Sequence, residues 1–374
     1  MKLAIYVHIP FCKSKCLYCD FYSIVSDRFE DYLFALLKEV ELYKKVLEES
    51  EVETVYFGGG TPSVVPPSFL LKVLESLARF SKRFAPSEVT VEVNPESIDQ
   101  KKLKTYKKIG INRISLGVQS CDDDVLKKIG RLYNEKTLRK KADIVLSSFE
   151  NVNFDFILGL PGETDRTLDK NLKFLEKFTP QHTSLYFLEI DEGTRLFNLL
   201  KKKIVVLPDE EEVEKRHDIF VEFLKRKEFK RYEISNFSKP GMESQHNLFY
   251  WRNWNYLGLG ASAGGHIGKE RYTNVSDIKK YAEMVNRKIF PREYYHVNSE
   301  KEEALETIFM GLRTIEGVDL KRVKILLPLI ERLQEKYTCY VKVKNDKIFL
   351  SERGMDYSKK IFSDLIEWYQ EGEK

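Results

Sequence analysis

The segment Leu3-Ala-Ile-Tyr-Val-His-Ile-Pro-Phe-Cys12-Lys-Ser-Lys-Cys16-Leu-Tyr-Cys19 carries the strongest structural signal in this chain of 374 residues. Its first part, Leu3–Ile9, is largely apolar and ends at a proline, which predicts a buried strand. Three cysteines then follow in a C-x3-C-x2-C spacing on the loop after that strand. Clustered cysteines in a long chain indicate metal or redox chemistry rather than disulfides.

The cysteine spacing fits a cube of four irons. Three thiolates, from Cys12, Cys16 and Cys19, can hold three corners and leave the fourth iron open to a ligand from outside the protein. Zinc is the competing interpretation, but structural zinc sites typically show paired C-x2-C units with four ligands, and no second pair exists here. The isolated Cys121 and Cys339 are expected to be small core residues rather than ligands.

Strand-like and helix-like patterns alternate through the first two hundred residues. Six repeats of strand and helix predict a parallel sheet with right-handed crossovers. The predicted fold is therefore α/β, a partial (β/α)6 barrel that is TIM-like but short of eightfold closure. The further predicted strands are Glu53–Phe57, Glu88–Val93, Asn112–Gly117, Asn151–Leu158 and Thr183–Leu188. The predicted helices are Phe29–Glu48, Pro67–Phe80, Ser97–Lys108, Asn134–Ser147 and Thr164–Phe178.

The alternation stops near Leu207, so three parts are expected. Residues 1–206 form the partial barrel, 207–298 an extension with an aromatic, Gly-rich stretch, and 299–374 a smaller C-terminal α/β domain. Lys344-Asn345-Asp346 is suitable chemistry for a hairpin turn in the last part. The elements expected after the barrel are helices at Asp209–Arg226, Ser276–Asn286 and Ser299–Leu312 and strands at Thr338–Val343 and Lys347–Leu350.

Composition excludes several classes of protein. Hydrophobic residues make up 42% of the chain and the formal net charge is +4, which is unlike a disordered chain or a strongly basic nucleic-acid binder. No stretch approaches twenty apolar residues, so no transmembrane segment is expected. The N-terminus lacks the apolar core of a signal peptide. A cytoplasmic protein without a nucleic-acid partner is the expectation.

Three predicted strands alternate apolar and polar residues with period two. Their apolar faces would pack against the outer helices, so their polar faces would line the barrel interior. A polar interior is costly unless something fills it, although hydrogen-bonded polar lining is the alternative. The residues on the polar faces are Thr90, Glu92 and Asn94, then Arg113, Ser115, Gly117 and Gln119, then Asn153 and Asp155.

The cysteine run after the first strand of a partial barrel resembles the radical S-adenosylmethionine (SAM) superfamily. Further motifs, in order over most of the first 165 residues, resemble the oxygen-independent coproporphyrinogen oxidases and their relatives. These motifs are Tyr6-Val-His8-Ile-Pro-Phe-Cys12, Gly58-Gly59-Gly60-Thr61-Pro62, Glu92-Val-Asn94-Pro95, Arg113-Ile-Ser-Leu-Gly117-Val-Gln119-Ser120, Gly130-Arg131 and Gly159-Leu-Pro161-Gly162.

The resemblance implies a [4Fe-4S] cluster on the three cysteines and a bound SAM molecule. Residue chemistry agrees, because Gly58–Gly60 let the backbone approach a ligand, although a tight turn without a ligand is the alternative. Carboxylates suit ribose hydroxyls and ammonium groups, and Arg131 suits the SAM carboxylate. The SAM contacts implied by the resemblance are Tyr6, Tyr18, Gly59, Gly60, Thr61, Glu92, Gln119, Arg131 and Asp155.

Three features of the sequence depart from the oxidases or their family. Phe21 stands where the oxidases carry a further cysteine, and only eleven residues precede Cys12, where the oxidases have an extension. Tyr133 replaces the histidine of the usual Gly-Arg-x-His pattern. This chain therefore lacks the histidine of that pattern.

A second motif, His246-Asn-Leu-Phe-Tyr250-Trp251, matches the H-N-x-x-Y-W signature of the radical SAM heme chaperones of the HemW type. These relatives bind heme and pass it to acceptor proteins. Histidine is a common axial ligand of heme iron, so the resemblance implies that His246 binds heme. From the residues alone, a hydrogen-bonded histidine beside an aromatic core patch is favoured. The segment from Asn253 to Gly260 is a candidate wall of an aromatic pocket.

The expected function is therefore that of a heme chaperone, with heme and heme-accepting proteins as partners. An oxygen-independent coproporphyrinogen III oxidase, which would decarboxylate propionates with a 5′-deoxyadenosyl radical, is the alternative. A radical SAM enzyme with another substrate is a more distant one. Whether the protein is an enzyme stays open, and no catalytic residue is assigned.

Overall fold

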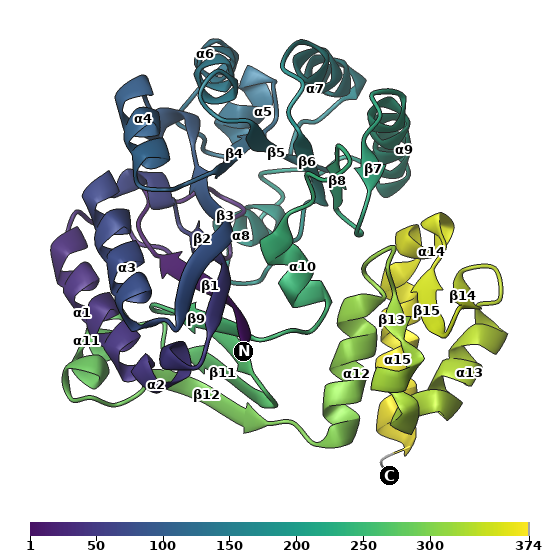
Figure 1. Cartoon of the computed structure of the whole chain (residues 1–374). Coiled ribbons are helices and arrows are strands. Elements are labelled where there is room, and N and C mark those ends of the chain that lie inside the picture. The colour runs from purple at the N-terminus through teal and green to yellow at the C-terminus, as the bar shows by residue number, and fades with distance from the viewer. Residues whose placement is uncertain (373–374) are drawn as a thin grey trace.

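The six predicted strands form one parallel sheet in the computed structural model of the chain, which describes residues 1–372 (Figure 1). Neighbours in the sheet follow the order of the sequence from β1 to β6. The predicted partial α/β barrel is thus confirmed. Its strands are β1 (Lys2–Ile9), β2 (Glu51–Gly59), β3 (Arg83–Val93), β4 (Arg113–Gln119), β5 (Asn151–Leu158) and β6 (His182–Phe187).

The extension adds strands to both edges of this sheet, which the sequence patterns did not predict. β9 pairs in parallel with β1, and β8 pairs antiparallel with β6. The full order runs from β12 at one end to β7 at the other, so the sheet does not close into a barrel. The added strands are β7 (Lys230–Arg231), β8 (Asn236–Ser238), β9 (Tyr256–Leu259), β10 (Gly264–Ile267), β11 (Glu270–Asn274) and β12 (Arg292–Val297).

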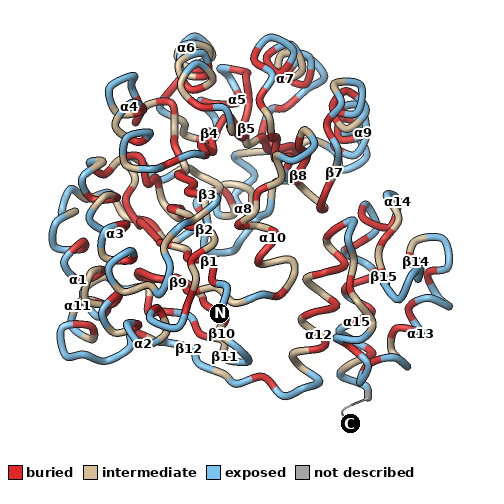
Figure 2. The backbone as a smooth tube through the Cα atoms, in the orientation of Figure 1, coloured by how far each residue is buried: buried red, intermediate tan, exposed pale blue. Residues whose placement is uncertain are grey.

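Helices cover the outer face of the sheet, where the apolar strand residues are buried (Figure 2). Residues of the barrel and of the extension share one hydrophobic core. The helices of these parts are α1 (Phe29–Leu42), α2 (Lys44–Glu48), α3 (Pro67–Phe80), α4 (Gln100–Lys108), α5 (Asp123–Lys128), α6 (Glu135–Leu146), α7 (Asp165–Lys177), α8 (Arg195–Lys201), α9 (Glu210–Arg226), α10 (Gln245–Trp251) and α11 (Ile278–Asn286).

Local chemistry explains where two predicted helices differ from the observed ones. The predicted helix Phe29–Glu48 divides at the buried Tyr43, whose backbone leaves the helical region (ψ 11°). The helix predicted from Ser97 begins only at Gln100, because the Asp99 side chain accepts the Lys102 amide at 2.7 Å and caps the first turn.

The C-terminal part has a hydrophobic core and a three-stranded sheet of its own. Asn345 and Asp346 both have positive φ, which confirms the predicted hairpin turn. Cys121 is buried as expected, but the expectation for Cys339 was wrong, because it is exposed on the turn before β14. The elements are α12 (Glu300–Gly311), β13 (Val318–Asp319), α13 (Leu327–Lys336), β14 (Val341–Lys344), β15 (Lys347–Leu350), α14 (Glu352–Asp356) and α15 (Ser358–Gly372). Among residues 1–372, no helix has the length and apolarity needed to span a membrane.

Candidate functional site

The cysteine loop lies at the carboxyl ends of the parallel strands. Cys12, Cys16 and Cys19 are free thiols on the segment between β1 and α1. Backbone hydrogen bonds fix this loop at Leu17, whose amide donates to the Ile129 carbonyl and whose carbonyl accepts from Leu196 at the start of α8. The carboxyl ends of parallel strands are where barrel active sites assemble.

A continuous set of side-chain contacts connects the two ends of this loop. The Sγ atom of Cys12 lies 3.4 Å from Thr61 Oγ1, which accepts from Asn94 Nδ2 at 3.0 Å. The Asn94 oxygen accepts from Arg131 Nη1 at 3.0 Å, and Arg131 Nη2 donates to the Tyr18 hydroxyl at 2.6 Å. The structure thus brings together four predicted site residues through Asn94. The prediction of SAM contacts left Asn94 out, although it lies in the Glu92-Val-Asn94-Pro95 motif.

A further predicted contact, Gln119, packs close to this set. Gly117 on the same strand approaches so closely that an added Cβ would lie 2.7 Å from Asn94 Oδ1 and 3.0 Å from Gln119 Nε2. Arg131 Nε is buried and, within residues 1–372, has no hydrogen-bond partner. An unused guanidinium donor at this position fits a ligand carboxylate.

Two carboxylates face the barrel interior beside these groups. Glu92 accepts the Tyr56 hydroxyl at 2.8 Å and the Gly59 amide at 3.2 Å. Asp155 accepts Ser115 Oγ and Asn153 Nδ2, each at 2.8 Å. Desolvation, with the charge of Asp155 adding to it, raises the pKa of Glu92 to about 7. Desolvation also raises the pKa of Asp155.

The predicted polar lining of the interior is confirmed on these strands. Arg113 on β4 is 2% exposed, and its positive charge opposes the rise of the pKa values of Glu92 and Asp155. His182 Nδ1 lies 2.7 Å from Asn153 Oδ1, which extends the polar contacts across to β6. His8, expected to be hydrogen-bonded inside the barrel, has ring nitrogens 3.2 Å from the Tyr6 hydroxyl and 3.0 Å from the Tyr22 carbonyl oxygen.

The glycine at the end of β2 is required by the protein's own packing. At Gly59, with φ of 109°, an added Cβ would lie 2.5 Å from the His8 ring. The Gly60 amide donates to the Ile9 carbonyl and the Thr61 amide to the Phe11 carbonyl. The amides of Gly59, Gly60 and Thr61 therefore all donate hydrogen bonds within the protein.

The donor set fits a cluster better than a single ion. Within residues 1–372, no three His, Cys, Asp or Glu side chains converge on one point as a single metal ion requires. A four-iron cube instead takes one thiolate at each of three separate corners. Three free thiols on one loop, beside an unused arginine donor, match a cube with an additional small-molecule ligand.

His246 lies at the amino-terminal side of the parallel strands, at the opposite end of the barrel from the cysteine loop. It has no exposed surface, and its two ring nitrogens lie 2.8 Å from Thr54 Oγ1 and 2.7 Å from the Tyr250 hydroxyl. The open axial ligand implied by the resemblance is therefore not present in this structure. The observed arrangement is the hydrogen-bonded histidine beside an aromatic patch, which the residues alone favoured. Ligation of heme would require the ring to leave one of these partners.

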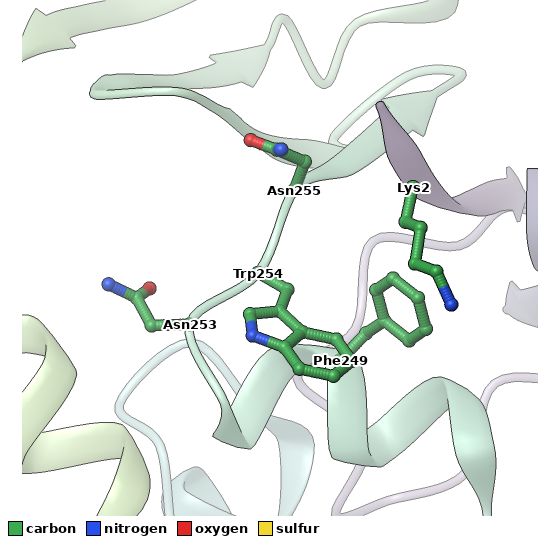
Figure 3. A pocket seen from close by; sticks show the side chains of 5 residues that line it. All are labelled: Lys2, Phe249, Asn253, Trp254 and Asn255. Carbon is green, nitrogen blue, oxygen red and sulfur yellow. The ribbon is translucent and has the colours of Figure 1, made fainter. Parts of the chain in front are cut away.

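A shallow pocket of about 270 Å³ lies beside α10, near the start of β1 (Figure 3). It is lined by Lys2, Phe249, Asn253, Trp254 and Asn255. The predicted aromatic wall from Asn253 to Gly260 is therefore realised only in part, because the later residues pack inside as β9. The volume is below the ~300–1,000 Å³ typical of sites that bury a drug-sized ligand.

Two residues that depart from the oxidases or from the wider family, Phe21 and Tyr133, have clear positions in the structure. Phe21 is 61% exposed beside the cysteine loop and provides no thiolate. The Tyr133 hydroxyl lies 2.9 Å from each of the carbonyl oxygens of Gly117 and Val118, so it stabilises the end of β4.

Comparison with known proteins agrees with this architecture. Residues 6–175 match the model of the radical SAM superfamily. The coproporphyrinogen III oxidase HemN of Escherichia coli, at 20% identity, superposes with a TM-score of 0.84 over 97% of this chain and 89% of its own. The fold and the cysteine loop thus define a radical SAM protein.

Relatives with similar sequences show to which family of radical SAM proteins the chain belongs. The heme chaperone HemW of Bacillus subtilis is 38% identical over 86% of both chains. HemW of Lactococcus lactis is 33% identical over 89% of this chain and 85% of its own. The bovine mitochondrial radical S-adenosyl methionine domain-containing protein 1 is 32% identical over 85% of this chain and 74% of its own. The chain belongs to the HemW family of radical SAM proteins.

Proposed function

We propose that this protein is a heme chaperone that binds heme, passes it to acceptor proteins, and carries a [4Fe-4S] cluster and SAM. The observation that carries the proposal is the 38% identity with a heme chaperone over 86% of both chains. The H-N-x-x-Y-W motif and the exposed Phe21, in place of a fourth cysteine, favour the chaperone over an oxidase.

The residues at the mouth of the barrel have distinct parts in this proposal. Cys12, Cys16 and Cys19 would hold the cluster, which when bound supplies an open iron for the amino and carboxylate groups of SAM. Arg131 would pair with the SAM carboxylate through its unused Nε donor. Glu92 and Asp155 would accept hydrogen bonds from ribose hydroxyls or the ammonium group.

The remaining predicted contacts surround these groups. Thr61 and Tyr18 are held in place by Asn94 and Arg131, as described above. The Tyr6 ring stacks against Tyr56 with centroids 6.2 Å apart. The carboxylate of Glu92, half-protonated near neutral pH in the free protein, would be driven to its ionised form by a cationic ligand.

The test separates the chaperone from the oxidase in one preparation. Anaerobically reconstituted protein is titrated with heme and then mixed with a heme-free hemoprotein, with free heme as the control. We expect a Soret band on binding, and transfer faster than from free heme. A second portion receives coproporphyrinogen, SAM and a reductant. Formation of protoporphyrinogen would favour the oxidase, and absence of heme binding would exclude the chaperone.

A further inference from the structure

The helix that carries the H-N-x-x-Y-W motif is anchored to a strand of the SAM site. Glu88 on β3 accepts from the Gln245 amide at 2.8 Å, the His246 amide at 3.3 Å and the Ser244 hydroxyl at 3.2 Å. Glu88 is 3% exposed and lies on the same face of β3 as Glu92, four residues later. The first turn of α10 is therefore fixed relative to the strand that ends in the SAM site.

The ring of His246 continues this connection through an aromatic contact. It stacks on Tyr56 with ring centroids 5.0 Å apart and planes at 26°. The bonds to Thr54 and Tyr250 described above hold both ring nitrogens, so the ring cannot turn without losing one of them. The pKa of His246 is lowered to about 3 by burial, so the ring is neutral.

Tyr56 contacts both the His246 ring and the Glu92 carboxylate. Its hydroxyl donates to Glu92 Oε1 at 2.8 Å, and its ring also stacks against Tyr6. Thr54, Tyr56 and Gly58 occupy alternate positions of β2, so all three face the interior. An added Cβ at Gly58 would lie within 3.1 Å of Tyr6, Tyr56 and Glu92, which shows how tightly these groups meet.

Two further motif residues, Tyr250 and Trp251, also have ring contacts within the protein. The Tyr250 ring packs edge-on against Tyr256 with centroids 4.6 Å apart. Arg313, just after α12, places its guanidinium 4.6 Å from the centre of the Trp251 ring. The motif helix therefore lies between the barrel and the C-terminal part, and the rings of Tyr250 and Trp251 contact one part each.

We propose that His246 is a positioning residue for SAM binding: its ring holds Tyr56 so that the tyrosine hydroxyl fixes Glu92 at the SAM site. The proposal rests on the SAM contacts proposed above for Glu92. It differs from axial ligation in its consequence, because loss of the ring would weaken the binding of SAM and leave the binding of heme intact.

The experiment measures the dissociation constant of SAM for the full chain with its cluster loaded. His246→Ala and Tyr56→Phe should each weaken SAM binding about three- to tenfold, the range that a stacked pair contributes. The double variant should be no weaker than the weaker single variant, because both changes act through one contact. His246→Phe restores a stacking ring and should recover most of the affinity.

A matched control is available in His217 on α9. It is also a buried histidine, 7% exposed, with a ring centroid 5.0 Å from that of an aromatic partner, Phe187. His217→Ala removes the same atoms away from Glu92 and should leave the affinity for SAM unchanged. Melting temperatures of all variants identify any general loss of structure, and His246→Phe serves if His246→Ala does not fold.

Several outcomes would overturn the inference. One is an unchanged SAM affinity in His246→Ala, and another is additive losses of SAM affinity in the double variant. A third is loss of the heme Soret band in both His246→Ala and His246→Phe, which would make the residue a heme ligand. Failure of the SAM site itself has a different signature. In that case Glu92→Gln and Arg131→Lys would also leave the SAM affinity unchanged.

Discussion

Arg131 donates from Nη2 to the Tyr18 hydroxyl at 2.6 Å, and Tyr18 lies between the second and third cysteines of the loop. The same guanidinium donates from Nη1 to Asn94 beyond the end of β3. One planar group therefore sets the distance between the cysteine loop and the strand ends. These side-chain bonds add to the backbone hydrogen bonds that hold the loop at Leu17.

Replacement of Arg131 by lysine should weaken SAM binding about 10- to 100-fold, because an ammonium group cannot reproduce the forked contacts of a guanidinium. The measurement is equilibrium binding of SAM to cluster-loaded protein. Arg139→Lys is the control, since Arg139 forms an ion pair with Glu135 on α6. Equal affinity in Arg131→Lys and wild type would rule out this role.

The three cysteines should be individually necessary for the cluster. Alanine at Cys12, Cys16 or Cys19 removes one of three corners, so reconstituted variants should contain far less iron and sulfide and lose the brown colour. Cys339→Ser, at an exposed thiol outside the loop, should retain both. Full iron content in any one of the three loop variants would contradict the proposed ligand set.

The affinity for SAM should rise with pH through neutrality. Below a pKa of about 7 Glu92 is protonated, and above it the carboxylate is ionised and attracts a cationic ligand. For a single group of this pKa, binding should strengthen about tenfold between pH 6 and pH 8. Glu92→Gln should remove most of this dependence, whereas Glu75→Gln, exposed on α3, should keep it. A profile unchanged by Glu92→Gln would assign the titration to another group.

The sequence predicted the barrel well because each of its strands and helices has a residue pattern within its own segment. Period-two alternation at Thr90, Glu92 and Asn94 correctly predicted an interior-facing polar row. The strands of the extension were missed because they are only two to six residues long. β9 pairs with β1, which lies more than two hundred residues away in the sequence, and no local pattern predicts such a partner.

In the candidate site, too, some residues were predicted from the sequence and others were missed. Cys12, Thr61, Arg131 and Tyr18 were identified from motifs, and the structure brings them together. Thr54 and Tyr56 were missed, although they alternate with Gly58 on β2 and so had a detectable signal. The surroundings of His246 depend on how α10 docks against β2 and β3. A docking of that kind comes from tertiary packing and cannot be inferred from a six-residue motif.

Glu39 connects the barrel to the extension and should make stability depend on pH. This fully buried carboxyl on α1 accepts from the Gly260 amide, the Asn274 side chain and the Tyr281 hydroxyl, each at 2.6 Å. Burial raises its pKa to about 7, against about 4.3 in an unfolded chain. Between these values the folded protein holds a proton that the unfolded chain has lost. The free energy of unfolding should therefore fall as pH rises from about 5 to 7, and remain lower above that.

Glu39→Gln keeps the size of the side chain but cannot ionise, so its stability should change less with pH. Between pH 5 and pH 8, the free energy of unfolding should fall by about 3 kcal/mol more in the wild type than in Glu39→Gln. Each unit of pKa shift is worth about 1.4 kcal/mol. Urea unfolding at the two pH values measures it. Glu41→Gln, exposed on the same helix, should follow the wild-type curve. If Glu39→Gln also follows the wild-type curve, Glu39 does not titrate in this range. The loss of stability at higher pH would then come from another buried carboxyl, such as Glu163, whose pKa is also raised to about 7 by burial.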